Sequence, residues 1–230
     1  MIVALDLPSA EAAKAHVELL GGSVSFYKLG LQLFMAGGYF ELINWLTDRG
    51  KQVFVDLKFF DVPETVASAV RQLKNYGASF ASVHGNDAML AAAANEKSGV
   101  KILAVTVLTS LDQGDMSALG FKTDIKPLVL SRAKRALALG CDGVISSGLE
   151  TRELRETLGE RILIVNPGIR PGANVAIEVD DQKRKSTVEE AFEHGADYIV
   201  VGRPIYTAKD PRAEADRIQE TIKELFGAKS

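Results

Sequence analysis

The sequence contains few of the residues from which metal centres and disulfide networks are built. Its 230 residues include one cysteine, Cys141, and three scattered histidines, His16, His84 and His194. One cysteine cannot form an internal disulfide, and isolated histidines have no metal-ligand spacing. We therefore expect a cytosolic protein with no metal.

Long apolar runs and an excess of basic charge are also absent. The apolar stretch at the amino terminus ends at Asp6, too early for a signal peptide or a membrane span, so we expect the mature protein to begin at the start of the chain. The 27 basic and 30 acidic residues give a net charge of -3. This balance gives no global positive field to attract nucleic acid or an anionic membrane, so we expect neither as a partner, and any anionic ligand must be held locally.

What remains is a globular composition, with 47% hydrophobic and 25% charged residues. Short β-branched runs alternate with segments of helical period, as in repeated strand-helix units around a parallel sheet. The eight expected strands are Ile2–Leu5, Val24–Lys28, Gln52–Leu57, Phe80–His84, Ile102–Leu108, Gly143–Ser146, Ile162–Val165 and Tyr198–Val201. The amphipathic segments between them include Glu11–Leu20, Gly38–Asp48, Glu64–Asn75, Lys126–Leu139, Thr151–Leu158, Thr187–His194 and Arg212–Phe226.

This order predicts a (β/α)8 TIM barrel formed by residues 1–230 as a single domain. An open doubly wound sheet is the alternative. That fold usually has a glycine-rich phosphate turn after its first strand, where this chain has Asp6-Leu7-Pro8-Ser9. Two long connections, residues 110–124 and 170–185, follow strand ends and are either active-site lids or surface insertions.

Charged residues lie near the ends of three neighbouring strands. Residues two apart in a strand share a face, so Asp56 and Lys58 should point into the barrel with Phe54, as should Asp6 and Lys28 from the first two strands. Barrel enzymes carry their chemistry at this end of the strands. A structural ion-pair cluster is possible, but four converging charges favour a functional site.

Three other polar residues have simpler interpretations. Asp61 precedes Glu64 by three residues, which is typical of a helix N-cap. His84 ends a strand and is interpreted as a hydrogen-bonded core residue, not as a ligand. Cys141 opens the sixth strand, at the wrong end of the barrel for nucleophilic chemistry.

Two glycine-rich turns follow the seventh and eighth strands. They read Pro-Gly-Ile-Arg-Pro-Gly at residues 167–172 and Gly-Arg-Pro at 202–204. Barrels often bind phosphate here, because glycine lets backbone N–H groups approach the oxygens and arginine adds a charged contact. The turns therefore predict a phosphate site that includes Arg170 and Arg203.

The segment from Asp56 to Thr65 reads Asp-Leu-Lys-Phe-Phe-Asp-Val-Pro-Glu-Thr and resembles the D-x-K-x-x-D-[IV]-P-x-T signature of the orotidine 5′-phosphate decarboxylase family. Further segments look like the bacterial branch of this family, in the same order along essentially the whole chain. They are residues 3–6, 27–30, 105–110, 167–171, 181–184 and 201–204. Residues 174–180 make that loop longer than the family's short form.

The resemblance implies loss of CO2 from orotidine 5′-phosphate to give uridine 5′-phosphate, the last step of de novo pyrimidine nucleotide synthesis, with no cofactor. Lys58 would stabilise negative charge at C6 of the pyrimidine and then protonate that carbon, and Asp56 would lie near the departing carboxylate. Lys28 and Asp61 would complete an alternating charge array and, with Asp6, would offer partners to the ribose hydroxyls.

The resemblance also implies contacts at the two ends of the substrate and between subunits. The residues implied to contact the pyrimidine or the phosphate are Thr109, Arg170, Gln182, Gly202 and Arg203. The family's two-fold homodimer would place Asp61 and Thr65 in the partner's site.

Two alternatives remain at this point. Magnesium-dependent sugar-phosphate lyases, such as hexulose-6-phosphate synthase, share the D-x-K-x-x-D core but hold the metal partly through a glutamate at the position of Lys28. An ammonium group cannot ligate Mg²⁺, so Lys28 disfavours that function. A non-catalytic phosphate-binding barrel would need the glycine-rich turns but would have no use for Asp56 and Lys58 side by side.

Overall fold

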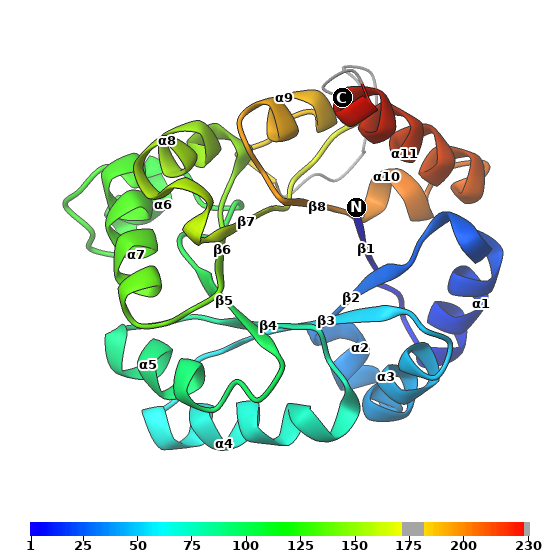
Figure 1. Ribbon diagram of the computed structural model, residues 1–230, viewed down its shortest axis with the longest axis horizontal. Helices are drawn as coiled ribbons and strands as arrows, with labels where there is room; N and C mark the ends of the chain where they lie inside the picture. The colour runs from blue at the N-terminus through cyan, green and yellow to red at the C-terminus, as the bar shows by residue number, and fades with distance from the viewer. Residues whose placement is uncertain (172–181, 228–230) are drawn as a thin grey trace.

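The computed structural model of the chain describes residues 1–171 and 182–227. Eight parallel strands close into a barrel in chain order, and the last strand pairs with the first (Figure 1). They are β1 (Ile2–Ala4), β2 (Phe26–Gly30), β3 (Gln52–Phe59), β4 (Phe80–Val83), β5 (Lys101–Val105), β6 (Gly143–Ile145), β7 (Leu163–Asn166) and β8 (Tyr198–Val201). The predicted (β/α)8 barrel is confirmed, and the open-sheet alternative is wrong.

Helices form the outer ring of the barrel (Figure 1). The α-helices are α1 (Ala10–Leu20), α2 (Leu31–Ala36), α3 (Tyr39–Thr47), α4 (Pro63–Leu73), α5 (Asp87–Asn95), α6 (Gln113–Ala118), α7 (Ile125–Ala138), α8 (Gly148–Leu158), α9 (Val188–Glu193), α10 (Arg203–Tyr206) and α11 (Pro211–Gly227). Short 3₁₀ helices in the described part of the chain are η1 (Gly21–Ser23), η2 (Lys74–Tyr76) and η3 (Gly159–Arg161). Within the described ranges, no helix has both the length and the apolar character needed to cross a membrane.

The strands separate two apolar layers by the two-residue alternation of their side chains. Phe54 points into the barrel with residues from the other strands, whereas Val53 and Val55 pack outward against the helices. The interior layer consists of Ile2, Ala4, Phe26, Phe54, Phe80, Leu103, Val105, Ile145, Val165 and Val200. The barrel is therefore a filled core that presents polar side chains only at its ends.

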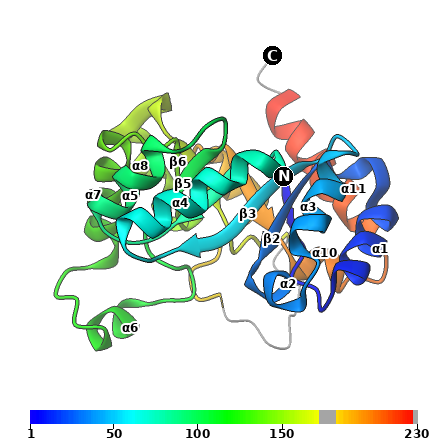
Figure 2. The ribbon, with the colours of Figure 1, turned by 90° about the horizontal axis from the view of Figure 1, so that it is seen from below.

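The segments that follow the strands gather at one end of the barrel. Figure 2 shows α2, which follows β2, and α6, which follows β5, at the same lower edge of the molecule. This is the carboxyl end of the strands, where barrel enzymes carry their active sites. Both helices belong to connections between a strand and its principal outer helix.

Seven of the eight strands differ from the prediction by one to three residues at one or both ends, and β2 and β5 are two examples. β2 begins at Phe26 and continues to Gly30, because Gly30 still pairs with Asp56 of β3. β5 ends at Val105, and the backbone N–H and the hydroxyl of Thr106 both donate to the backbone carbonyl of Ile145 as the chain leaves the sheet. Val107 and Leu108, the apolar residues that follow, line the cavity described below.

Candidate active site

A cavity of about 620 Å³ opens at the carboxyl end of the strands. Apolar side chains of the barrel interior, including Phe54 and Val200, form part of its wall. Nine of the eleven predicted site residues line it, namely Asp6, Lys28, Asp56, Lys58, Thr109, Arg170, Gln182, Gly202 and Arg203. The barrel thus brings together residues that are almost two hundred positions apart in the chain.

Four of these residues form a chain of alternating charge across β1, β2 and β3. Lys28 Nζ lies 3.2 Å from Asp6 Oδ1 and 3.3 Å from Asp56 Oδ2. Lys58 Nζ lies 3.0 Å from Asp56 Oδ1. Each oxygen of the Asp56 carboxylate therefore faces a different ammonium group.

The close pairing keeps the buried members of this chain ionised. Burial of Lys28 lowers the pKa of its ammonium, but the neighbouring carboxylates of Asp56 and Asp6 outweigh burial and raise the pKa above its ordinary value. Burial raises the pKa of Asp56, but Lys28, Lys58 and a hydrogen bond from Ser82 together lower it below its ordinary value. The charges of Lys28 and Asp56 are therefore present throughout the neutral pH range.

A glycine makes this packing possible. A Cβ atom at Gly30 would lie 3.3 Å from Asp6 Oδ1 and 3.4 Å from Lys28 Nζ. These contacts are tight for polar atoms that already hold their ion-pair geometry. Gly30 at the end of β2 therefore leaves the space that the two charged groups occupy.

The backbone of β3 is irregular where the charged residues stand. In the pairing of β3 with β4, Val55 lies opposite Ala81 and Phe59 lies opposite Val83. The chain therefore advances four residues in β3 where it advances two in β4. This is a β-bulge, and Lys58 within it has a φ angle of 49°. Among the described residues, Lys58 alone has a positive φ without being glycine.

The residues predicted for the pyrimidine and the phosphate come from the segments that follow β5, β7 and β8. Thr109 Oγ1 donates a 2.5 Å hydrogen bond to Gln182 Oε1, which joins the segments after β5 and β7. Gly202 precedes α10, whose first residue is Arg203. Residues 172–181, which include most of the second long connection, lie outside the described part of the chain.

The segment after residue 181 is fixed by a buried arginine. Arg184 Nη1 donates to Glu150 Oε1 at 2.7 Å, and its Nη2 donates to the carbonyls of Val107 and Leu108 at 3.0 Å each. The Arg184 backbone N–H donates to the carbonyl of Thr109. These contacts hold the Gln182 end of the connection against the chain that leaves β5.

The other two predicted site residues, Asp61 and Thr65, lie outside the cavity of this chain. Both are exposed, on the segment that leads from β3 into α4. The predicted N-cap role of Asp61 is wrong, because α4 begins at Pro63 and its N-cap is Val62. The Asp61 carboxylate instead accepts a 2.6 Å hydrogen bond from the backbone N–H of Val62.

Two residues that the sequence analysis excluded from the site, His84 and Cys141, also lie outside this cavity. His84 is half-buried with its ring 5.6 Å from that of Phe60, and burial, Arg132 and Lys58 lower its pKa. Cys141 is buried, and burial raises the pKa of its thiol to about 12. A thiol with that pKa is not a nucleophile at neutral pH.

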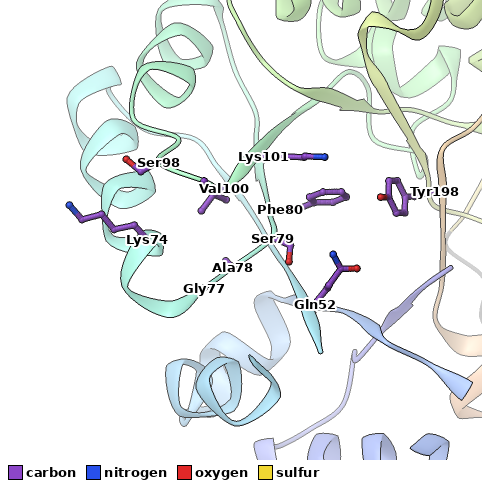
Figure 3. Close-up of a pocket in the computed structure, with 11 residues that line it drawn as sticks. Gln52, Lys74, Gly77, Ala78, Ser79, Phe80, Ser98, Val100, Lys101 and Tyr198 are labelled. Atoms are coloured by element: carbon purple, nitrogen blue, oxygen red, sulfur yellow. The ribbon is translucent and has the colours of Figure 1, made fainter. Parts of the chain in front are cut away.

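A second cavity of about 410 Å³ lies at the amino end of the strands (Figure 3). Gln52, Phe80, Lys101 and Tyr198, which open four of the strands, point into it. The Phe80 and Tyr198 rings pack edge to face at 5.2 Å, and Lys101 Nζ lies 5.9 Å from the Phe80 ring centre. This end contains none of the predicted site residues, and its aromatic cluster closes the barrel interior.

Sequence reasoning assigned no role to Ser82 or Arg184. Ser82 is fully buried, donates to Asp56 Oδ1 at 2.7 Å and accepts from the Lys58 backbone N–H at 2.9 Å. Ser82 lies two residues after Phe80 in β4, so both side chains point to the same face of the strand. This alternation could have predicted that the Ser82 hydroxyl points into the barrel, beside Asp56. Arg184 belongs to one of the segments that resemble the family, but its ion pair had no local signal, since its partner Glu150 belongs to a distant helix.

The described residues contain no group of three or more His, Cys, Asp or Glu side chains able to hold a metal ion. The Asp6 carboxylate instead faces the ammonium of Lys28, and the Asp56 carboxylate faces those of Lys28 and Lys58. The charge of these carboxylates is thus balanced within the protein.

Comparison with known proteins identifies relatives of this architecture. The model of the orotidine 5′-phosphate decarboxylase / HUMPS family matches residues 1–218. The orotidine 5′-phosphate decarboxylase of Methylococcus capsulatus is 59% identical over 228 residues, which cover 99% of this chain and 93% of the relative. The orotidine 5′-phosphate decarboxylase of Xanthomonas axonopodis pv. citri is 50% identical over 225 residues, which cover 97% of this chain and 91% of the relative.

Solved structures show the same relationship. The crystal structure of orotidine 5′-phosphate decarboxylase from Lactobacillus acidophilus superposes with a TM-score of 0.83 at 37% identity, covering 96% of this chain and 97% of that one. The crystal structure of orotidine 5′-phosphate decarboxylase from Pyrococcus horikoshii superposes with a TM-score of 0.77 at 28% identity, covering 97% of this chain and 99% of that one. The chain therefore belongs to the orotidine 5′-phosphate decarboxylase / HUMPS family.

Proposed function

We infer that the chain converts orotidine 5′-phosphate to uridine 5′-phosphate and CO2, as a carboxy-lyase of pyrimidine nucleotide synthesis. Family membership and curated relatives of the same name support this reaction. The structural observation that carries it is the Lys28-Asp56-Lys58 ion-pair chain within one cavity that also contains Arg203. The arrangement offers fixed charge near the reacting carbon and a cation for the phosphate.

The difficulty of the reaction lies in the electron pair left on C6 of the pyrimidine. When the bond from C6 to the carboxylate breaks, CO2 leaves and the pair stays on C6, where nothing in the ring delocalises it. The Lys58 ammonium stabilises this charge and then transfers a proton to C6, which forms the new C–H bond. Lys58 regains its proton from solvent, so the cycle balances without a cofactor.

Asp56 has two roles in this proposal. Its Oδ1 atom accepts from Lys58 Nζ, which directs the ammonium toward the cavity. Its negative charge also lies near the carboxylate of the substrate, and this repulsion disappears when CO2 departs. Lys28 balances Asp56 on the opposite side, which keeps Asp56 ionised in a largely buried place.

The remaining cavity residues orient the substrate. Asp6 and Lys28 offer hydrogen-bond partners to the ribose hydroxyls, and Thr109 faces the pyrimidine. The phosphate is held by Arg203 and the backbone beside Gly202, with Arg170 and Gln182 from the segment after β7.

We further propose that a second copy of the chain completes each site. Asp61 and Thr65 lie outside the cavity of their own chain, and their segment carries two exposed apolar side chains, Phe60 and Val62. α2, which follows the neighbouring strand, exposes two more, Leu31 and Met35. A two-fold dimer that buries these four apolar residues would bring Asp61 and Thr65 to the partner's cavity.

The function is tested by incubating the full chain with orotidine 5′-phosphate and following its ultraviolet absorbance, with and without a chelator. We expect turnover at the same rate in both samples. Lys28 stands where the magnesium-dependent relatives have a glutamate, so a requirement for Mg²⁺ would contradict the assignment and favour the sugar-phosphate lyases.

A further inference from the structure

The bulge in β3 leaves one backbone group without its usual partner in the sheet. The β3 to β4 ladder is regular up to Val55 and resumes at Phe59, whose carbonyl accepts from the N–H of His84. Between these points the Lys58 N–H faces β4 at Ser82. It donates to the side-chain oxygen of Ser82 at 2.9 Å instead of to a backbone carbonyl.

The same hydroxyl is bound to the catalytic carboxylate. Ser82 Oγ lies 2.7 Å from Asp56 Oδ1, the oxygen that also accepts from Lys58 Nζ at 3.0 Å. A serine hydroxyl has one proton to donate and lone pairs that accept. Because the proton goes to Asp56, the lone pairs receive the Lys58 N–H, and both hydrogen bonds are fixed in direction.

We propose that Ser82 is a positioning residue for the decarboxylation, holding the Asp56 carboxylate and the Lys58 backbone in the one arrangement that aims the Lys58 ammonium at C6. This inference rests on the proposed function. Ser82 is fully buried in β4 and lies behind Asp56, outside the described cavity lining, so it acts through its two neighbours and not on the substrate.

The φ angle of Lys58 gives Ser82 a specific task. A φ of 49° is unfavourable for a residue with a side chain, and such a conformation persists only where the surroundings enforce it. The hydrogen bond from the Lys58 N–H to Ser82 is the described contact that holds this peptide from the β4 side. Without it, we expect Lys58 to relax toward ordinary strand geometry and its ammonium to move relative to Asp56.

The test compares kcat and KM of Ser82→Ala, Ser82→Cys and Ser82→Thr in the full chain with orotidine 5′-phosphate as substrate. The alanine and cysteine variants should lose about ten- to a hundredfold in kcat, the scale of a hydrogen bond to a charged group, with KM nearly unchanged. Cysteine keeps a side chain of similar shape but is a weak hydrogen-bonding group. Threonine keeps the hydroxyl and should retain kcat close to that of the unmodified chain.

Ser146→Ala is the matched control, because Ser146 is equally buried beside the end of β6 and its hydroxyl accepts from Asn166, which is not part of the Lys28-Asp56-Lys58 chain. It should leave kcat unchanged. Equal kcat values for Ser82→Ala and the unmodified chain, or equal losses in Ser82→Ala and Ser82→Thr, would overturn the proposal. So would a loss confined to KM.

A crystal structure of Ser82→Ala separates this proposal from the proposed function. If the unmodified chain did not decarboxylate orotidine 5′-phosphate, the function would fail. The structural part of the Ser82 inference would still be judged by whether Lys58 leaves its φ of 49° in the alanine variant. An unchanged φ and an unchanged distance from Lys58 Nζ to Asp56 would contradict the role of Ser82.

Discussion

Lys28 Nζ lies 3.3 Å from Asp56 Oδ2, and both side chains are almost completely shielded from solvent. Each group keeps the other charged, because the pKa of Asp56 is lowered and that of Lys28 is raised. Breaking a buried ion pair is more costly than breaking an exposed one, since the remaining charge stays buried. The pair therefore links stability to pH in a definite direction.

We predict that Asp56→Asn lowers the free energy of unfolding at neutral pH by about 3 kcal/mol. The folded-state pKa of Asp56 lies below its ordinary value of 3.8. Its stabilising contribution is thus fully present above pH 3.8 and is lost as the pH falls through the folded-state pKa. Urea unfolding of both proteins from pH 7 downward measures this, with Asp48→Asn, at an exposed position, as the control. A difference that stays constant well below pH 3.8 would contradict the prediction.

Lys58→Ala should abolish turnover while uridine 5′-phosphate still binds. The substitution removes both the proton donor and the charge that stabilises C6, effects that together amount to at least about 10⁴-fold in rate. Absorbance assays and titration calorimetry measure the two properties, and Lys223→Ala, at an exposed position of α11, serves as the control. A variant with both Asp56 and Lys58 replaced gives the background rate. If Lys58→Ala is more than about ten times as active as this double variant, Lys58 is not the proton donor.

Arg203→Ala should weaken binding of the phosphorylated substrate by about ten- to several-hundredfold, the usual scale of a charge-assisted contact. The phosphate-free nucleoside should be nearly unaffected, because it lacks the group that Arg203 binds. Inhibition or binding constants for the two compounds give the comparison, and Arg152→Ala, at an exposed position of α8, controls for loss of an arginine. Equal losses for both compounds would show that Arg203 does not hold the phosphate.

Mixing Lys58→Ala and Asp61→Asn chains tests the shared site. If Asp61 acts in the partner's cavity, each mixed dimer has one intact site and one site with both lesions. With random exchange, half of the dimers are mixed and half of their sites are restored, so about a quarter of the unmodified activity should return. If Asp61 acts within its own chain, every site keeps a lesion and nothing returns.

Subunit exchange is verified in the same experiment by tagging one chain and recovering both together. Mixtures of Lys58→Ala chains with Asp56→Asn chains provide the control, because both residues line the same cavity and no site can be restored. Verified exchange without recovered activity would return Asp61 to a local role.

The barrel could be predicted because its signals are local. The alternation of Val53, Phe54 and Val55 already separates the helix-facing side of β3 from the interior, and the same parity predicted that Asp56 and Lys58 share a face. The family signature supplied the functional roles, including those of Asp61 and Thr65 across a dimer. The dimer, the cytosolic location and independence from metal remain predictions.

Other features could not be predicted because they depend on pairing between segments. The two extra residues of β3 appear only when its register with β4 is known, and the alternating pattern continues through them. Ser82 becomes important only through that bulge. The N-cap assignment to Asp61 failed because Pro63 occupies the first helical position, which proline favours, and this makes Val62 the cap.

The left-handed backbone of Lys58 places stability and activity in opposition at a single position. Glycine would adopt a φ of 49° without the steric cost of about 1 kcal/mol that a side chain brings, but glycine has no amine to donate the proton. Selection for thermal stability alone would therefore favour a residue at position 58 that selection for catalysis must reject. A stabilised version of this barrel must therefore keep Lys58 and gain its stability at residues outside the site, since natural proteins accept such strain where function demands it.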